Sequence, residues 1–287
     1  MSHWISAKDE ALYTFSRRTV RAVASITFCI LVSLLAGCGY ASRAAVIAAG
    51  STSVQPFAEI LAEDYMKVNP GLTVDVQGGG SAAGILAAES GTADIGMSSR
   101  ALIGDETKLW SVEIARDGLA LIVNPKNPVG SLSLAQARDI YAGVVKNWNE
   151  LGGLNSRIHV VAREDGSGTR GSFESMVMGK TQIAATAIVQ DSNGAVRQVV
   201  ASDPDAIGFL SLGLVDKSVK AVELEGVEAT RENVLNGSYG LSRPFLFVSK
   251  EHPTGQAEQF VEFTLSAEGR KILDAEGLIT GTGSVSK

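Results

Sequence analysis

The sequence predicts an α/β protein with a largely parallel sheet. Three units of strand, loop and helix follow one another between about residues 44 and 100. Each starts with a short apolar or alternating run, at 44–49, 72–76 and 93–97, of the kind found in buried strands. Helical spacing of apolar residues follows the first run, at Phe57, Leu61 and Tyr65. Strands that alternate with helices in this way usually form a parallel sheet.

Local signals place the remaining elements. Gly91 closes an alanine-rich helix over 82–90, and Ser133 with Gln136 forms a capping box for a helix that runs to Tyr141. Asp117-Gly118 is typical of a turn. The other expected elements are a first helix over 54–68, strands at 119–123, 158–162, 206–211 and 246–249, a helix over 172–178 and another over 256–276. Breaks near Asn124 and Gly237 favour two domains between which the chain crosses twice.

Residues 1–37 have the features of a leader and are set aside from fold reasoning. Three arginines precede an uncharged, mostly apolar run over 22–37, which is shorter than the roughly 20 residues that a spanning helix needs. The run ends in LAGC at 35–38, which resembles the bacterial lipobox. We therefore expect 1–37 to be a lipoprotein signal peptide and Cys38 to carry the lipid. An ordinary signal peptide or a membrane anchor that contains a cysteine is the alternative, and the SRR at 16–18 weakly suggests a twin-arginine signal.

The remaining chain is acidic. The whole sequence has 25 basic and 31 acidic residues, and without the four basic and two acidic residues of the leader 21 and 29 remain, a net charge of −8. A chain of this charge is not drawn to nucleic acid or to anionic lipid, so it would have to hold an anion with local donors. The only cysteines are Cys29 and Cys38, which leaves no thiol for a disulfide or a nucleophile. No cluster of metal ligands occurs, and no cofactor is expected.

Four loops rich in glycine and hydroxyl groups follow predicted strands. They are GSTS at 50–53, GGGS at 78–81, SSR at 98–100 and REDGSGTRG at 163–171. Ligands of α/β sheets lie at the carboxyl ends of strands, and the start of a helix offers free N–H groups. Each loop alone is typical of a turn or a helix cap. Together they supply hydroxyls, N–H groups and arginines, a set that favours a tetrahedral oxyanion.

Other sites fit less well. Residues 166–171 match G-x-G-x-x-G, and Asp191 lies 20 residues further on, as in a dinucleotide fingerprint. An exported protein meets little NAD, however, and the other loops would stay unexplained. A P-loop is excluded because the GKT at 179–181 lacks the preceding glycine. A serine hydrolase is poorly supported, since no G-x-S-x-G occurs and His159 and His252 are the only histidines after the leader.

The motifs resemble those of periplasmic phosphate-binding proteins of ABC transporters, the PstS-like family. The resemblance rests on AAGSTSVQPFAE from 48, VQGGGSAAGI from 76, ADIGMSSR from 93, REDGSGTRGSFE from 163, NWNELGG from 147, IGFLSLG from 207 and LSRPF from 241. It covers essentially the whole chain after the leader. It implies a type II periplasmic-binding-protein fold, with two α/β lobes, a central ligand cleft and two crossover segments. Lobe I would comprise 38–122 and 241–287, and lobe II 123–240.

The resemblance also implies a binding site for one inorganic phosphate. The implied ligand residues are Thr52, Ser53, Ser81, Ser98, Ser99, Arg163, Ser167, Gly168 and Thr169. Arg163 would form a charged fork held in line by Asp165, with Arg100 in a supporting position. The implied protein is a monomer without catalytic activity. It would be exported and anchored by its lipid, in the periplasm or on the outer face of the cell membrane. There it would deliver phosphate to ABC permease subunits.

One residue departs from the family pattern. Many members place an aspartate where this chain has Ser99. A carboxylate there accepts the proton of hydrogen phosphate and repels sulfate, whereas a hydroxyl adds no charge. A receptor for another oxyanion, such as sulfate or molybdate, therefore remains an alternative. A surface lipoprotein for sensing or adhesion is a further one, and a phosphatase is remote because no nucleophile–base pair is visible.

Overall fold

The computed structural model describes residues 46–281 and 285–286. The predicted signal peptide and Cys38 lie outside the described residues. Within the described ranges, the structure has no helix that is both long enough and apolar enough to cross a membrane.

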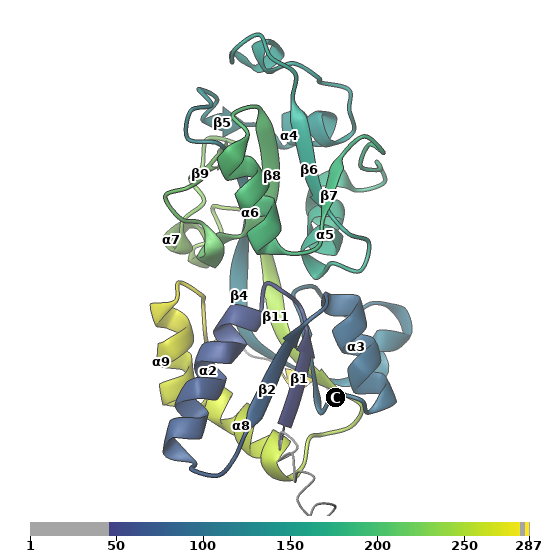
Figure 1. Ribbon diagram of the computed structural model, residues 1–287, viewed down its shortest axis with the longest axis vertical. Coiled ribbons are helices and arrows are strands. Elements are labelled where there is room, and N and C mark those ends of the chain that lie inside the picture. The colour runs from purple at the N-terminus through teal and green to yellow at the C-terminus, as the bar shows by residue number, and fades with distance from the viewer. Residues whose placement is uncertain (1–45, 282–284, 287) are drawn as a thin grey trace, which may run out of the picture. The chain divides into compact units, whose positions relative to one another are not determined.

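The elements gather around separate hydrophobic cores in two groups, which we call lobe I and lobe II (Figure 1). Lobe I contains β1 Val46–Gly50, α2 Gln55–Val68, β2 Val74–Gly78, α3 Ser81–Ser90, β3 Ile95–Ser98, the 3₁₀ turn η1 Gly104–Lys108, β11 Ser242–Ser249, α8 Gly255–Leu265 and α9 Ala267–Ala275. Strand β4, Trp110–Val123, runs through both lobes, and β12, Val285–Ser286, pairs with it. The limits of 38–122, 123–240 and 241–287 for the lobes stay a proposal.

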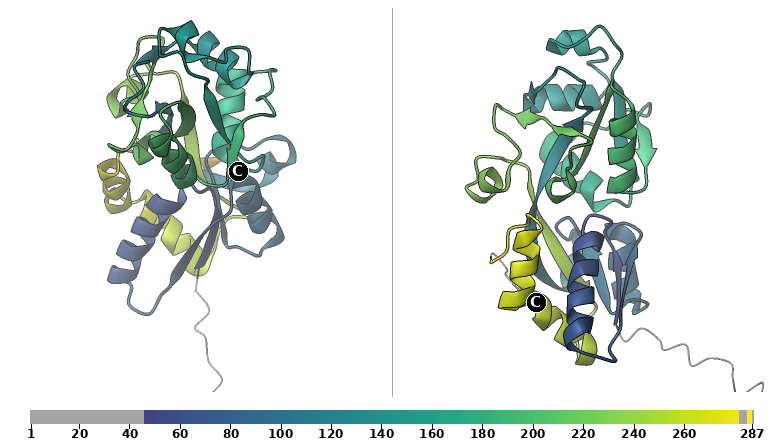
Figure 2. Two further views of the ribbon diagram at one scale, coloured as in Figure 1. Left: turned by 45° about the horizontal axis from the view of Figure 1, so that its top comes forward. Right: turned by 60° about the vertical axis from the view of Figure 1, so that its left-hand side comes forward.

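Lobe II holds the middle of the chain. It contains β5 Ser131–Leu132, α4 Leu134–Tyr141, η2 Trp148–Leu151, β6 His159–Arg163, α5 Gly168–Phe173, the π-helical turn η3 Glu174–Met178, β7 Ile188–Gln190, α6 Asn193–Ser202, β8 Ala206–Ser211, η4 Leu212–Leu214, β9 Lys220–Ala221, β10 Glu223–Leu224 and α7 Arg231–Leu235. Figure 1 and the right-hand view of Figure 2 show that the polypeptide passes between the two groups along β4 and β11.

The main sheet has the strand order β2-β1-β3-β11-β4-β8-β6-β7. Within lobe I, β1 is parallel to β2 and β3, and within lobe II, β6 is parallel to β7 and β8. The central strands β11 and β4 are antiparallel to each other and to their outer neighbours. The α/β class is therefore confirmed, but the sheet is mixed and not largely parallel, because the two strands that join the lobes run in opposite directions.

The predicted turn at Asp117-Gly118 is wrong, because both residues lie inside β4. Their partners on β11 are Arg243 and Ser242. A Cβ atom on Gly118 would lie 2.9 Å from a methyl group of Leu212, so glycine is needed here for close packing. Asp117 is buried and bonded to Arg243. The Asp-Gly pair therefore serves an ion pair and close packing between neighbouring segments, and not a turn.

Several helix boundaries follow their sequence signals, and two do not. Ser133 caps α4 through the predicted box, and Gly91 ends α3 in the left-handed conformation with φ 72°. The predicted helix over 256–276 is two helices, α8 and α9, which meet at Ser266. Helix α5 starts at Gly168, inside the glycine-rich loop, and not at Ser172.

An aromatic stack fixes α5 against the sheet of lobe II. The rings of Phe173 on α5 and Phe209 on β8 are stacked, with centroids 4.2 Å apart, and Tyr141 packs against both. All three side chains are buried. Aromatic contacts of this kind stabilise beyond their buried area. The start of α5, which carries the loop residues, is therefore held in place by the core.

Close backbone contact positions α3 on the sheet of lobe I. A Cβ atom on Gly84 would lie 2.4 Å from the carbonyl oxygen of Ala49 and 2.6 Å from the Cα atom of Gly50. Only glycine allows helix α3 to come this near to β1. This approach brings Ser81, at the start of α3, to the end of β1.

We expect Gly84→Ala to lower the free energy of unfolding by about 1–3 kcal/mol, because the added methyl group overpacks the contact between α3 and β1. Urea unfolding followed by circular dichroism measures the change. Gly194→Ala in α6 is the matched control. Nothing lies within 4 Å of the Cβ position of Gly194, so alanine there should stabilise slightly. Equal effects of the two substitutions would contradict the packing argument.

Candidate oxyanion-binding site

The four glycine- and hydroxyl-rich loops meet between the lobes. The hydroxyl of Ser53, from the loop after β1, lies 2.7 Å from that of Thr169 on α5. The backbone N–H of Ala82 donates to the carbonyl of Gly166 at 3.1 Å. Ser172 of lobe II donates to the backbone carbonyl that follows β3 in lobe I. The carboxyl ends of β1, β2, β3 and β6 therefore converge, as the sequence predicts.

Most hydroxyls of these loops are enclosed by protein. The side chains of Ser53, Ser81, Ser99, Ser167 and Thr169 are 0–2% exposed, and Thr52 is half-buried. Burial of a hydroxyl costs free energy unless it is hydrogen-bonded. Ser167 meets this demand as the N-cap of α5, where its oxygen accepts from the N–H of Arg170. The backbone N–H groups of the first turn of α5 lie beside this cluster.

The two serines at the end of β3 have different surroundings. The Ser98 hydroxyl donates to the carbonyl of Arg100 and closes a local turn. The Ser99 hydroxyl lies 2.9 Å from that of Ser51 and 3.4 Å from that of Ser81. The structure thus brings Ser99 into the hydroxyl cluster, while Ser98 bonds within its own loop. Ser51, which sequence reasoning missed, donates to Ser99.

Arg163, at the end of β6, is the central cation of this cluster. Its side chain is 1% exposed, and Nε and Nη2 donate to the Glu164 carboxylate at 2.9 and 2.8 Å. Nη2 also donates to Thr52 Oγ1 at 3.2 Å. Nη1 is buried and has no hydrogen-bond partner among the described residues. An unpartnered buried donor of a charged group is costly, so this atom indicates a missing acceptor.

The predicted pair between Asp165 and Arg163 is not formed. Asp165 is 91% exposed and pairs with Arg170 at 2.7 Å, while Glu164 takes the place beside Arg163. In an extended strand, the side chains of residues 163 and 165 would lie on the same side. Strand β6, however, ends at Arg163. The side-chain alternation therefore does not continue into the turn.

Arg100 does not add a free charge to the cluster. Its guanidinium forks onto the Glu106 carboxylate at 2.6 and 2.8 Å. This hydrogen bonding from Arg100 lowers the pKa of Glu106, against the opposing effect of burial. Arg100 also packs near lobe II, since a Cβ atom on Gly171 would lie 3.1 Å from its Cδ.

Sequence reasoning missed a second buried arginine. Arg243 on β11 is 1% exposed and donates from Nε and Nη2 to Asp117 Oδ2 at 3.0 and 2.9 Å. Its Nη2 also donates to Ser53 Oγ at 3.1 Å. Burial raises the pKa of Asp117, and the charge of Arg243 opposes this. The signal in the sequence was the position of Arg243 within the LSRPF motif.

Asn193 is a further residue that sequence reasoning missed. It is the first residue of α6, it is 1% exposed, and its amide nitrogen donates to Ser53 Oγ at 2.9 Å and to Thr52 Oγ1 at 3.2 Å. These bonds join lobe II to lobe I. Asn193 lies outside the four glycine- and hydroxyl-rich loops, so the sequence around it did not indicate a role in the site.

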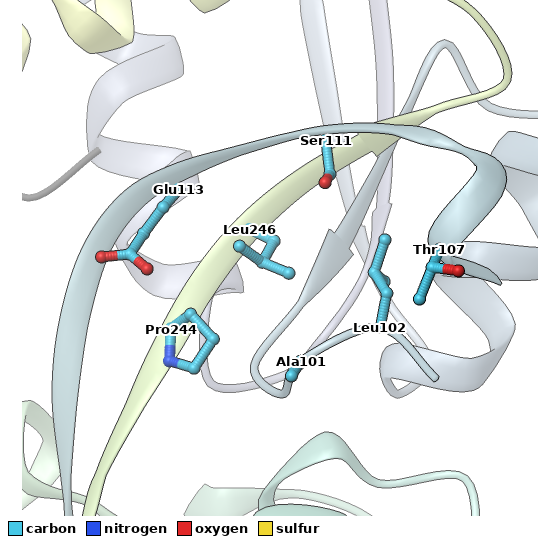
Figure 3. Close-up of a pocket in the computed structure, with 7 residues that line it drawn as sticks. All are labelled: Ala101, Leu102, Thr107, Ser111, Glu113, Pro244 and Leu246. Carbon is cyan, nitrogen blue, oxygen red and sulfur yellow. The ribbon is translucent and has the colours of Figure 1, made fainter. Parts of the chain in front are cut away.

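Another hollow does not suit an anion. A cavity of about 340 Å³ lies beside the two crossover strands, β4 and β11 (Figure 3). Its lining residues are Ala101, Leu102, Thr107, Ser111, Glu113, Pro244 and Leu246. Its one charged lining residue is the Glu113 carboxylate, which bonds to Arg116. Within the described ranges, no three His, Cys, Asp or Glu side chains are grouped to hold a metal ion.

Fold and site together define a ligand-binding protein with two α/β lobes and a buried polar site between them. Residues 39–268 match the model of the PBP superfamily domain. The chain is 34% identical over 239 residues to the phosphate-binding protein PstS of Bacillus subtilis strain 168, a match that covers 81% of this chain and 79% of the relative.

Solved structures agree. A putative phosphate ABC transporter substrate-binding protein with bound phosphate from Clostridium perfringens is 45% identical, with a TM-score of 0.80, and the match covers 83% of this chain and 99% of that one. An ABC-type phosphate transport receptor from Vibrio cholerae is 40% identical, with a TM-score of 0.70, over 82% of this chain and 100% of that one. The chain belongs to the PstS family of phosphate-binding proteins.

We expect Asp117→Ala to lower the free energy of unfolding by about 3–5 kcal/mol, because it leaves the Arg243 charge buried without its partner. Urea unfolding measures the loss. Asp64→Ala is the control. It removes the partner of Lys67 in an exposed ion pair, where solvent screens the charges, and should change stability little. Similar small effects of both substitutions would contradict the cost expected for an unpaired buried charge.

Proposed function

We propose that this protein binds inorganic phosphate outside the cytoplasmic membrane and passes it to an ABC permease for import. The observation that carries the proposal is the unpartnered Nη1 of Arg163 in a cluster of buried hydroxyls. A tetrahedral oxyanion supplies the missing acceptor, and a guanidinium can fork onto two of its oxygens. The family relationship makes phosphate the favoured oxyanion.

Both lobes would contribute ligand contacts. In lobe I these are Thr52, Ser53, Ser81 and Ser99, with Ser98 in the same loop. In lobe II they are Arg163, Ser167, Gly168 and Thr169. A Cβ atom on Gly168 would lie 2.7 Å from the Ser99 hydroxyl and closer still to Ser81, so glycine lets the lobes meet here. The N–H groups at the start of α5 would face the anion.

In this proposal the protein binds phosphate and does not transform it. A hydrolase needs a nucleophile activated by a nearby base. The imidazole of His159 bonds to Asp203, and that of His252 bonds to the carbonyl of Pro253. Release would come from movement of one lobe against the other, in which β4 and β11 bend.

The residue at position 99 keeps sulfate as a second candidate ligand. Ser99 is buried in the hydroxyl cluster and brings no negative charge to repel an anion without protons. The carboxylates near the site, Glu164 and Asp117, are already bonded to arginines. Discrimination against sulfate would therefore need an acceptor other than a free carboxylate.

Arg163→Ala should weaken phosphate binding at least about hundredfold, since it removes charge-assisted hydrogen bonds, and Thr169→Val should weaken it about tenfold. Isothermal titration of purified protein stripped of phosphate measures both. Arg231→Ala is the matched control, because Arg231 pairs with Asp274 away from the loops. Unchanged affinity in the two site variants would count against the assignment. A sulfate titration of the unsubstituted protein decides between a phosphate receptor and a general oxyanion receptor.

The lipid anchor is part of the same proposal. LAGC at 35–38 supports modification of Cys38 after cleavage of residues 1–37. We expect Cys38→Ala to abolish incorporation of labelled fatty acid and to lower the amount of protein in the membrane fraction. Phosphate affinity should stay the same, because residue 38 is not one of the proposed ligand residues and precedes β1 in the sequence. Equal labelling of both proteins would contradict a lipid at Cys38.

A further inference from the structure

We propose that Asn193 and Arg243 are positioning residues that fix the direction of the hydrogen bonds of Thr52 and Ser53, so that Thr52 directly, and Thr169 through its bond from Ser53, donate toward the ligand. The inference rests on the proposed function and concerns which protonation state of the anion the site prefers. Neither residue is among the implied ligand residues, and both are 1% exposed.

Ser53 shows the effect most directly. Its Oγ accepts from the amide of Asn193 at 2.9 Å and from Nη2 of Arg243 at 3.1 Å. A guanidinium and an amide NH₂ can only donate, and a hydroxyl has two acceptor positions. Both acceptor positions of Ser53 are therefore filled, and its single hydrogen must be donated.

Thr52 is arranged in the same way. Its Oγ1 accepts from the amide of Asn193 at 3.2 Å, and it shares the two hydrogens of Arg163 Nη2, also at 3.2 Å, with Glu164 Oε1 and the carbonyl of Asp191. The orientation of that amide is fixed at its other end, because Asn193 Oδ1 accepts from the backbone N–H of Ser211. A flipped amide would set an NH₂ group against this N–H. The hydrogen of Thr52 is thus also left to be donated.

The direction of the hydrogen bonds is also set in the rest of the cluster. Thr169 Oγ1 lies 2.7 Å from Ser53, which has to donate, so Thr169 accepts that bond and keeps its own hydrogen for a ligand. On the other side, Ser51 accepts from the N–H groups of Ser53 and Val54 and donates to Ser99. The loops therefore present hydrogens, together with Nη1 of Arg163.

Such a set of donors favours oxygens without protons. An anion with a further O–H group would place that hydrogen against another hydrogen, and a buried donor without an acceptor is costly. The charged groups around Thr52 and Ser53 are Arg163 of β6 with Glu164, and Arg243 of β11 with Asp117. Each carboxylate bonds to its arginine. The site should therefore bind the phosphate dianion more tightly than the monoanion.

The test is calorimetric titration of the purified protein with phosphate, well below and well above the second pKa of inorganic phosphate. Unsubstituted protein should bind more tightly at the higher pH. Asn193→Ala should lose about tenfold in affinity at the higher pH and about threefold or less at the lower, because freed hydroxyls can turn and accept. Asn193→Asp keeps the shape but accepts the two hydrogens itself, and should lose about hundredfold at the higher pH.

Asn127→Ala is the matched control. Asn127 is 4% exposed, and its amide bonds to the carbonyl of Pro204, away from the loops. Its loss should leave affinity unchanged at both pH values. Tighter binding of the monoanion by the unsubstituted protein, or an equal proportional loss at both pH values in both Asn193 variants, overturns the inference. Failure of the unsubstituted protein to bind phosphate at either pH overturns the proposed function itself.

Discussion

Two arginine side chains, Arg163 and Arg243, are buried at the place where the lobes meet, and the burial of their charge constrains everything around them. A guanidinium removed from water needs acceptors for its hydrogens and a compensating charge. Arg243 obtains both from Asp117 on the neighbouring crossover strand. Arg163 obtains its charge partner from Glu164 but keeps one nitrogen without an acceptor. One arginine is therefore fully paired at the junction, and the other has a donor left to bind a ligand.

The same constraint explains how the crossover strands are built. Strand β4 runs through both lobes, and Asp117 is buried on it between β11 and the end of β8. An aspartate in this position is satisfied by Arg243 and by the hydroxyl of Ser211 from lobe II. Burial of an ion pair is seldom a net stabilisation compared with apolar packing. Here the pair of Asp117 and Arg243 connects β8 of lobe II and β11 of lobe I to the loop that holds Ser53.

Much of the fold could be read from the sequence, because the strand–loop–helix units of lobe I have strong local signals. Gly91 and the box of Ser133 with Gln136 mark their helix ends correctly. Asp117-Gly118 misled because local composition cannot distinguish a turn from a glycine that allows close packing. The loops of the site were found through their hydroxyls. Asn193 and Arg243 could not be assigned a role, since their contacts join segments more than a hundred residues apart.

The site also resolves an apparent conflict between the acidic chain and an anionic ligand. The net charge of −6 gives no general attraction to phosphate. Within the site, each buried arginine already has a carboxylate, so the cluster has little excess positive charge to offer. The anion must therefore be bound through oriented hydrogen bonds more than through net charge. The donors are hydroxyls whose acceptor positions are filled by arginine and amide groups. Donors held in place before the ligand arrives need no reorganisation, which is why a nearly neutral site can bind an anion.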